Sequence, residues 1–498
     1  MTEPAEDLPQ SETWIVRNGL GVQVMETLAV GAFLTALAVQ LGAPNWMIGA
    51  LAAIPHLAQI AQIPALWTVE KVRQRRRIYL LSGAVARPML FVIAIAAVAL
   101  PPMMALWVIL LAFTLRYVAG AFLSCAWNSW MRDLVPEDEL GRLFGNRQRK
   151  MIGISILFSL LAAGFIDAWT SWVLWPVTYA YSVVYVIAFL GGAYSVICAR
   201  RIFEPTMQPA THEPLLAQIR KPFAQENYRR LITFLGSWNF AVNLAAPFFT
   251  VYMLRRLEYD LIIVIGLATL SQLAAFVTVK NWGLFADRVS NKTVLRTCCP
   301  IFILAIFGWT FTTLPDPHEF TLALLVVIHI LTGISTAGVN LSTANIALKL
   351  APQGDAPAYL SASAMVNAAA AGVAALLGGI TVDLMASWQL SLSINWQSAD
   401  SELALNAMHF SHWDFFFLLA VVLGIYALHR LSLVSERGEV QDARLLSLLL
   451  GSTRQSLKNL STIAGLRDAS NFPLDELLIV EDEEKKRADT DDENEPPR

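Results

Sequence analysis

The chain has 498 residues, of which 56% are hydrophobic and 15% are charged, and its formal net charge is −3. An ordinary soluble domain carries about 25% charged residues, so this composition excludes a water-soluble fold. The apolar runs are continuous, which excludes the alternating strands of a membrane β-barrel. No nucleic-acid partner is expected.

Twelve apolar runs follow one another along the chain. Each is long enough to cross a hydrocarbon core of about 30 Å as a helix. The predicted spans are 14–41, 45–67, 78–100, 103–130, 151–170, 172–199, 229–254, 260–281, 295–314, 319–348, 358–386 and 411–430. The sequence therefore predicts an all-α polytopic protein embedded in the lipid bilayer.

Basic residues gather in every second connection between the spans. Examples are Lys71 after the second span, Arg149 after the fourth and Arg296 after the eighth. By the positive-inside rule, these connections and both termini are expected in the cytoplasm. The protein is then multi-pass in the plasma membrane, or in the inner membrane if its source is bacterial. The acidic start lacks the basic region of a cleavable signal peptide, so none is expected.

The spans form two groups of six, which predicts two helical bundles. Residues 1–199 form the N-terminal bundle and 229–435 the C-terminal bundle, joined by a cytoplasmic linker at 200–228. Residues 436–498 form a predicted cytoplasmic tail that begins with an amphipathic helix and ends in acidic, disordered sequence. The tail either regulates the protein or is a solvated extension.

Landmarks in the two groups repeat at a nearly constant offset. The segment WTVEKVR begins at Trp67 and corresponds to WGLFADR beginning at Trp282, an offset of 215. Pro136 corresponds to Pro352 at an offset of 216. Many secondary transporters build a central site from a duplicated membrane domain whose halves face each other.

The connection between the eighth and ninth spans has the sequence GLFADRVSNK at 283–292. It resembles the G-x-x-x-D-R-x-G-R-R/K loop motif of the major facilitator superfamily, with departures at Ser290 and Asn291. The resemblance implies two six-helix pseudo-symmetric bundles. It also implies a latch that holds the cytoplasmic side shut while the site faces outward.

Four residues of this loop are the candidates for the latch. Gly283 would permit close helix approach, and Asp287 would accept hydrogen bonds from the N-terminus of a neighbouring helix. Arg288 and Lys292 would pair with carboxylates or face anionic lipid. The first-half loop lacks the glycine and the aspartate of the pattern, and Glu70 is the available substitute there.

The fourth span contains RYVAG, beginning at Arg116, which resembles the R-x-x-q-G motif of proton-coupled members of the superfamily. An arginine within a span costs about 2.5–3.5 kcal/mol on insertion scales, so Arg116 should face the cavity and have a partner. Glu26 in the first span is the expected partner, because the resemblance brings the first and fourth spans together. Separation of the pair would let Glu26 take up a proton. A static ion pair that fixes two helices is the alternative.

Other polar residues within the spans are candidates for the central cavity. They are Arg87, His56, Gln59, Asn239, Asn243 and His329. Arg87 adds a second buried positive charge, which favours an anionic or zwitterionic substrate unless backbone carbonyls satisfy it. The amides and His56 either bind substrate or join helices. His329 lies four residues before a glycine, as Arg116 does, and its imidazole is a candidate for titration near neutral pH.

Two further pairs are candidates for gating. Asp167 and Asp383 occupy matching outer ends of the fifth and eleventh spans, and they are either hydrated interfacial groups or an external gate. Asp133 and Arg142 lie in a segment that resembles the loop between the fourth and fifth spans of many members. They are expected to form gating ion pairs without substrate contact.

No motif indicates an enzyme, a cofactor or a metal site. Walker A, H-E-x-x-H and G-x-S-x-G patterns are missing from the sequence, and the short cluster His409, His412 and Asp414 is read as incidental. The expected function is secondary active transport of a small solute by a rocker-switch, with protons as the candidate coupling ion. An uncoupled facilitator and a non-transporting scaffold or sensor are the alternatives.

Overall fold

The computed structural model describes residues 4–207, 221–313, 318–352, 356–398 and 401–436. Within these residues, twelve helical segments are long and apolar enough to cross a membrane, which confirms the predicted all-α polytopic fold. Part of the predicted linker and the predicted tail beyond residue 436 lie outside the described residues.

The first bundle contains six spans, three of which are interrupted. Its elements are α1 (Pro4–Ala29), α2 (Ala32–Gln40), α3 (Asn45–Leu57), η1 (Ala58–Ala61), α4 (Gln62–Val72), α5 (Arg75–Ala86), α6 (Pro88–Ala99), α7 (Pro102–Leu134), α8 (Glu137–Trp172) and α9 (Thr178–Ala199). Gly31 has a φ of 63°, which glycine adopts without strain, and it separates α1 from α2. Pro88 lacks a backbone N–H and begins α6 directly after Arg87. Interrupted backbone within a membrane is tolerated where it is buried in protein or lines a cavity.

The second bundle repeats this order with fewer breaks in its helices. Its elements are α11 (Glu226–Arg255), α12 (Leu261–Arg288), α13 (Asn291–Gly308), η2 (Trp309–Phe311), α14 (Thr321–Leu350), α15 (Ala356–Met385) and α16 (His412–Ser432). Within the first bundle α1 packs on α9 and α5 on α7, and within the second α12 packs on α14 and α11 on α15.

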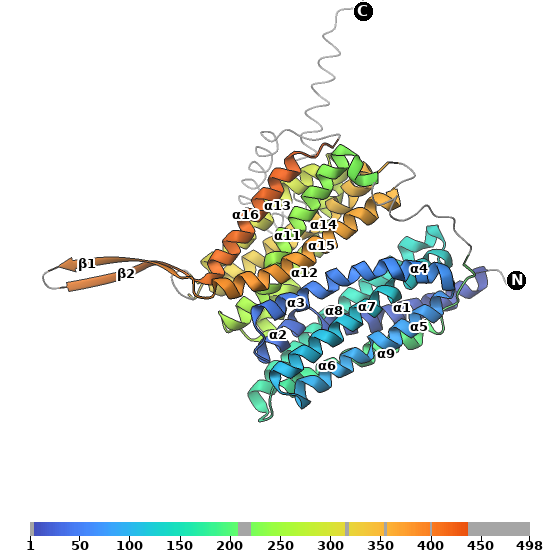
Figure 1. Ribbon diagram of the computed structural model, residues 1–498, viewed down its shortest axis with the longest axis horizontal. Coiled ribbons are helices and arrows are strands. Elements are labelled where there is room, and N and C mark those ends of the chain that lie inside the picture. Colours follow the sequence, from blue (N-terminus) through green and yellow to red (C-terminus); the bar gives the residue numbers. More distant parts are fainter. Residues whose placement is uncertain (1–3, 208–220, 314–317, 353–355, 399–400, 437–498) are drawn as a thin grey trace, which may run out of the picture.

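A β-hairpin lies between the last two membrane helices, where the predicted spans at 358–386 and 411–430 leave a connection, and it joins α15 to α16. Strand β1 (Leu390–Ser398) pairs antiparallel with β2 (Ser401–Phe410), with Leu390 opposite Phe410. The hairpin projects away from the helices (Figure 1). We use it to name the two ends of the molecule: the hairpin face carries it, and the linker face is the opposite end, where α9 ends and α11 begins.

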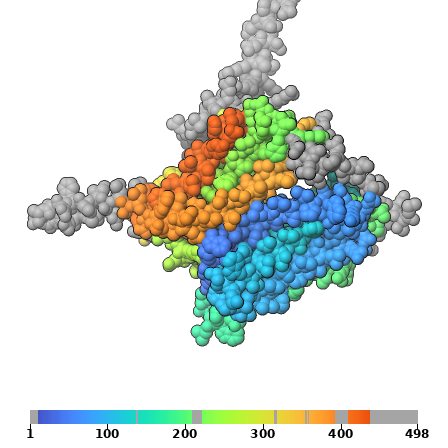
Figure 2. Space-filling view, in the orientation of Figure 1, coloured from blue at the N-terminus to red at the C-terminus, as the bar shows by residue number. Residues whose placement is uncertain are grey.

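The two bundles meet near the hairpin face. There α3 packs against α15 and α8 against α12, which pairs the second span with the eleventh and the fifth with the eighth. The bundles diverge toward the end where the chain begins (Figure 1), and the space-filling view shows their broad contact near the hairpin (Figure 2).

Small residues allow α3 and α15 to approach closely. A Cβ atom added to Gly49 would lie only 3.2 Å from the backbone nitrogen of Gly379. A Cβ atom added to Gly379 would lie 2.7 Å from the Cα of Trp46. Small residues at such crossings are the usual basis of tight helix packing in membranes, because the main chains can then make direct contact.

Candidate functional site

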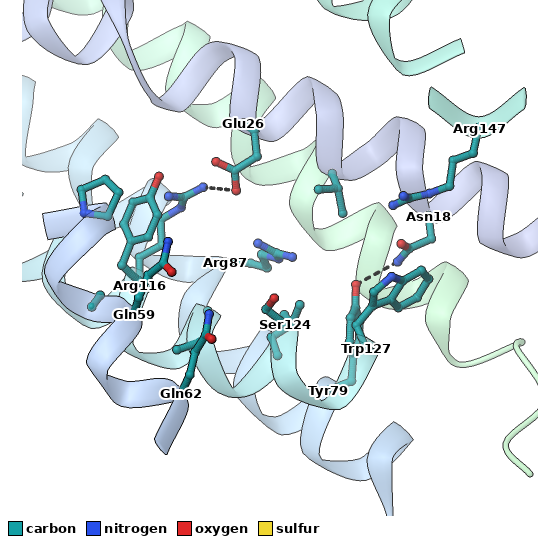
Figure 3. Close-up of a pocket in the computed structure, with 17 residues that line it drawn as sticks. Asn18, Glu26, Gln59, Gln62, Tyr79, Arg87, Arg116, Ser124, Trp127 and Arg147 are labelled. Carbon is teal, nitrogen blue, oxygen red and sulfur yellow. Dashed lines mark hydrogen bonds and ion pairs between the residues drawn. The ribbon is translucent and has the colours of Figure 1, made fainter. Parts of the chain in front are cut away.

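A cavity of about 330 Å³ lined by charged and polar side chains lies within the first bundle. Its walls come from α1, the broken α3–η1–α4 span, the α5–α6 break, α7 and α8 (Figure 3). The charged side chains that line it are Glu26, Arg87, Arg116 and Arg147. This volume is at the lower end of the range for ligand pockets, which suits a small solute.

Glu26 and Arg116 form an ion pair at this cavity. Oε1 of Glu26 on α1 accepts from Nη2 of Arg116 on α7 at 2.6 Å. The Arg116 side chain is 3% exposed, whereas that of Glu26 is 40% exposed. The Arg116 guanidinium also lies over the ring of Tyr117, 4.7 Å from its centroid. The carboxylate is therefore the accessible member of the pair, and the guanidinium is the buried one.

Arg87 lies in the middle of the cavity residues because α5 ends there and Pro88 begins α6 (Figure 3). Its side chain is buried, and Nη1 donates to the sulfur of Met25 at 3.0 Å. Its Nε has no hydrogen-bond partner among the described residues. Gly192 on α9 leaves room for it, since a Cβ there would lie 3.0 Å from the Arg87 Cδ.

Arg147 is a cavity residue that the sequence analysis missed by assigning it to a loop. The helix α8 begins at Glu137, well before the predicted start of this span at residue 151. Leu140, Leu143 and Phe144 precede Arg147 at helical spacing, and Leu143 is buried. This apolar stripe is the signal that would have extended the helix, because positions three and four residues apart share a face.

Asn18 and Tyr79 were also missed, and they close one end of the cavity. Nδ2 of Asn18 donates to the Tyr79 hydroxyl at 2.9 Å and to the carbonyl of Ser195 at 2.8 Å. Asn18 and Glu26 both line the cavity from α1. Their separation of eight residues corresponds to about two turns, and this spacing was the available signal.

A second cavity of about 390 Å³ continues the first toward the linker face. The two share Gln62 and Ser124 as lining residues. The second cavity then runs along α4 and α7 to Arg132, near the end of α7, and to Met207. The polar site is therefore reached from the linker face.

The hairpin face is closed by two aspartates that bridge the bundles. Asp167 on α8 accepts from the backbone N–H groups of Leu261, at 3.2 Å, and Ile262, at 2.7 Å. Asp383 on α15 accepts from the backbone N–H groups of Asn45, at 3.2 Å, and Trp46, at 2.8 Å. Each carboxylate thus caps the first turn of a helix in the other bundle, where backbone donors have no partner within the helix.

An arginine adds to this closure. Arg255, at the end of α11, donates to the carbonyl of Ala43 at 2.6 Å and to Oδ1 of Asn45 at 3.1 Å. These contacts lie at the α3 N-terminus that Asp383 caps. The hairpin face is therefore held closed by hydrogen bonds between the bundles as well as by the close packing of α3 on α15.

Of the remaining cavity candidates, Gln59 lines the cavity, whereas His56, Asn239, Asn243 and His329 are not among its lining residues. His56 is half-buried beside it on α3. Asn239 and Asn243 donate to carbonyls of their own helix, at 2.9 and 2.8 Å. His329 is buried on α14, where Nδ1 lies 2.8 Å from the Leu325 carbonyl and the ring packs against Trp309.

The proposed latch residues differ in their surroundings in this conformation. Asp287 and Arg288 are exposed, and a Cβ on Gly283 would meet only Leu341, at 4.0 Å. The expected close approach at Gly283 is therefore not present here. Lys292 is buried, so of its two predicted roles exposure to lipid is wrong, and pairing with a carboxylate stays a prediction.

The N-terminus of α13, the helix that follows the latch sequence, is capped within its own bundle. Glu436 accepts from the Lys292 backbone N–H at 2.7 Å and from Nδ2 of Asn291 at 3.0 Å. Lys349 pairs with the same carboxylate at 3.1 Å. The carboxylate at the start of the predicted tail thus holds the loop that carries the latch sequence.

The other gating candidates pair within the first bundle. Asp133 pairs with Arg75, and the buried Arg75 also donates to the Pro205 carbonyl at 2.6 Å. Arg142 pairs with Glu12 at 2.6 Å and with Glu139 at 3.3 Å. These pairs join α5, α7, α8 and the start of α1, so they stabilise one bundle and do not link the two.

This combination of twelve membrane-length helices, two facing bundles and a polar cavity open at one face defines a membrane transporter. The chain belongs to the Major Facilitator Superfamily, whose family model matches residues 19–375. No curated protein is significantly similar to it.

Solved transporter structures resemble this chain over most of its length. The nucleoside transporter NupG superposes with a TM-score of 0.60 at 14% identity, covering 85% of this chain and 98% of that chain. A POT family transporter in complex with 5-aminolevulinic acid gives 0.60 at 10% identity, covering 87% and 100%. A bacterial homolog of the human lysosomal transporter Spinster, inward-facing and unoccupied, gives 0.58 at 13% identity, covering 86% and 96%. At these identities the likeness shows the fold alone.

Proposed function

We propose that this protein is a proton-coupled secondary transporter that moves a small solute by rocker-switch alternating access. The observation that supports this most directly is the Glu26–Arg116 ion pair at the cavity, with a buried guanidinium and an accessible carboxylate. An intramembrane carboxylate that faces a cavity is a typical proton-carrying group.

Coupling follows from competition for Arg116. While the pair is closed, the Glu26 carboxylate is engaged by the Arg116 guanidinium. An anionic group of the substrate, or a rearrangement between α1 and α7, would separate the two side chains. Glu26 would then bind a proton and release it when the pair closes again, so proton and substrate movements would be linked.

Alternating access follows from the contacts between the bundles. On the positive-inside rule the linker face is cytoplasmic, and the described conformation is then inward-facing. Opening to the outside would break the caps made by Asp167 and Asp383 and the Arg255 contacts. The exposed Asp287 and Arg288 would find partners when the linker face closes.

The substrate is a small solute, and the cavity favours an anion or a zwitterion. The names of the similar structures include a nucleoside transporter and a carrier in complex with 5-aminolevulinic acid. These names support transport but differ in chemistry. The preference for a negative group therefore rests on the arginines that line the cavity of this chain.

The test is proton flux in sealed vesicles that contain the purified full-length protein. Carboxylates, phosphate esters, amino acids, sugars and hydrophobic cations are screened as substrates. In the wild type, one class should produce substrate-dependent proton movement. Glu26→Gln should abolish the proton movement, because the amide cannot carry the proton.

Glu226→Gln is the matched control. Glu226 forms an ion pair of 2.5 Å with Arg230 on α11, but its side chain is 67% exposed and does not line the cavity. Its substitution should leave proton flux unchanged. Substrate uptake without proton movement, equal in wild type and Glu26→Gln, would instead identify an uncoupled facilitator. If no solute moves, the transport proposal fails and the scaffold or sensor alternative is favoured.

A further inference from the structure

The first cavity is lined by more positively charged side chains than negatively charged ones. Glu26, Arg87, Arg116 and Arg147 line it, which gives one negative and three positive groups and a formal charge of +2. Arg116 is the arginine that has a carboxylate partner there. Among the described residues, no carboxylate pairs with Arg87 or Arg147. Uncompensated charge is unfavourable away from bulk water, so the cavity holds positive charge that a ligand could neutralise.

Both unpaired guanidinium groups retain hydrogen-bonding capacity. Arg87 is 6% exposed; it donates to the thioether of Met25, which is a weak acceptor, and it interacts with the Tyr79 hydroxyl. Arg147 is half-buried, with its guanidinium 5.5 Å from the centroid of the Trp127 ring. The Nε atoms of both residues are buried and unpaired among the described residues. A guanidinium offers several N–H donors in a planar fork that matches a carboxylate or a phosphate.

The two arginines come from different parts of the fold and reach the same space. Arg87 projects from the α5–α6 break, and Arg147 from the extended start of α8. Figure 3 shows Arg87 between the Glu26–Arg116 pair on one side and Asn18, Tyr79 and Arg147 on the other. A ligand in the cavity would therefore meet one guanidinium at its centre and a second toward Asn18.

We propose that the transported substrate is a small organic dianion, either a dicarboxylate or a phosphate monoester, bound by Arg87 and Arg147. This inference rests on the proposed transport function and specifies its substrate class. Two negative charges would cancel the +2 of the cavity while Glu26 stays ionised. A monoanion would leave one charge uncompensated, and a neutral solute would leave both. The volume of about 330 Å³ also favours a small molecule.

The test measures equilibrium binding to the purified full-length protein in detergent, at low chloride and without a gradient. Succinate, butyrate, γ-aminobutyrate and putrescine form a series of equal chain length whose charge varies from dianion to dication. Glycerol phosphate tests the phosphate monoester arm. Succinate or glycerol phosphate should bind at least about tenfold more tightly than butyrate, and putrescine should not bind. Whichever of succinate and glycerol phosphate binds more tightly shows whether the substrate is a dicarboxylate or a phosphate monoester.

Variants assign the binding to the two arginines. Arg87→Gln and Arg147→Gln should each weaken dianion binding at least about tenfold and reduce the preference for a dianion over butyrate. Arg87→Lys should keep part of the affinity, because it keeps the charge but not the fork. If Arg87→Gln does not fold, the half-buried Arg147 still provides the test. Arg149→Gln is the matched control, since Arg149 lies on the same helix, is exposed and does not line the cavity.

The inference is overturned if no dianion binds, if butyrate or γ-aminobutyrate binds as tightly as the dianions, or if the variants bind like the wild type. Its failure is distinct from failure of the proposed function. Proton-coupled uptake of a neutral or zwitterionic solute would refute the dianion and leave the transporter intact. Dianion binding without any transport would support the dianion and refute the transport function.

Discussion

Water reaches the two partners of the Glu26–Arg116 ion pair to very different extents. The side chain of Arg116 is 3% exposed and that of Glu26 is 40% exposed. Removing one partner of a buried pair destabilises by about 3–5 kcal/mol, because the other charge is left buried. Ion pairs in contact with water are worth about 0–1 kcal/mol. Substitution of Glu26 leaves a buried arginine without its partner, whereas substitution of Arg116 leaves a carboxylate that water reaches. The two substitutions should therefore destabilise the protein to different extents.

We expect Glu26→Gln to lower the free energy of unfolding by up to about 3–5 kcal/mol, because it leaves Arg116 charged and buried. Arg116→Gln should cost less, because the remaining carboxylate faces the cavity. The double variant should be more stable than Glu26→Gln alone. Thermal unfolding of the four proteins in detergent gives the order and the coupling between the two sites. An equal loss of unfolding free energy in both single variants would show that the exposure of the remaining partner does not determine the cost of breaking the pair.

The residues of the cavity differ in how visible they are in the sequence. Glu26, Arg87 and Arg116 stand out because a charge inside an apolar span is rare. Arg147 does not, because it lies where α8 is amphipathic and hydropathy alone ends the span. Arg147 raises the formal charge of the cavity from +1 to +2, and this contribution becomes apparent only when α8 packs against α1 and Arg147 reaches Trp127 on α7.

At the scale of helices, the same interaction closes the hairpin face in two places: an aspartate of one bundle caps a helix N-terminus of the other. Asp167 caps α12 and Asp383 caps α3. The two aspartates are 216 residues apart, and so are the capped residues Trp46 and Ile262. A carboxylate at a helix N-terminus contributes about 0.3–1 kcal/mol and up to about 2 kcal/mol when partly buried. Each cap links opposite bundles, so both contributions favour closure of this face.

We expect Asp167→Asn and Asp383→Asn to shift the protein toward the state that is open at the hairpin face. A loss of about 1–2 kcal/mol per cap corresponds to a shift of roughly five- to thirtyfold, and the double variant should shift by about the product. Ala375→Cys, in a background without native cysteines, reports the change because Ala375 is 1% exposed and packs against Gly49. Labelling by a membrane-impermeant maleimide from the hairpin side should become faster in both variants.

Glu258→Gln is the control for this experiment. Glu258 is exposed in the connection before α12 and lines neither cavity. Its substitution should not change the labelling rate. An unchanged rate in both aspartate variants would assign closure of this face to packing of α3 on α15 instead of to the caps.

Hydropathy predicts the existence of each membrane helix, but it does not predict where helices end or what projects beyond them. The first-half spans contain a break at Gly31 that the apolar pattern does not reveal, whereas Arg87 and Pro88 mark the break of the third span in the sequence. The hairpin was missed because an outer loop was assumed between two strong spans. Its first strand does alternate apolar and polar residues from Leu390 to Trp396, which is the period of a strand.

In the whole molecule, carboxylates cap helix N-termini at both faces. The caps at the hairpin face join the two bundles, whereas those at the linker face lie within one bundle. At the linker face Glu204 accepts from the Arg76 backbone N–H at 3.0 Å and Glu436 from that of Lys292 at 2.7 Å, each within its own bundle. Arg76 and Lys292 are again 216 residues apart. This arrangement favours two units that each stay intact while the contacts between them change, as the rocker-switch proposal requires.

The same contacts separate a transporter from a sensor that acts through its tail. The tail joins the bundle at Glu436, whose side chain is 1% exposed and holds the start of α13. A stop codon after residue 440 removes the rest of the tail and keeps this cap. We expect such a truncated protein to retain substrate uptake within about twofold and to keep its unfolding temperature, because every described helix contact remains.

Glu436→Gln in the full-length chain should behave differently from the truncation. Hydrogen bonds to a charged group contribute about 1.5–3 kcal/mol, and the amide would leave Lys349 without its carboxylate. We therefore expect a lower unfolding temperature, measured in detergent beside the truncated protein. Uptake that is lost on truncation, while Glu436→Gln still transports, would mean that residues beyond 440 take part in turnover. Stability and transport would then depend on different parts of the C-terminal region, and the tail would have to be included in the transport mechanism.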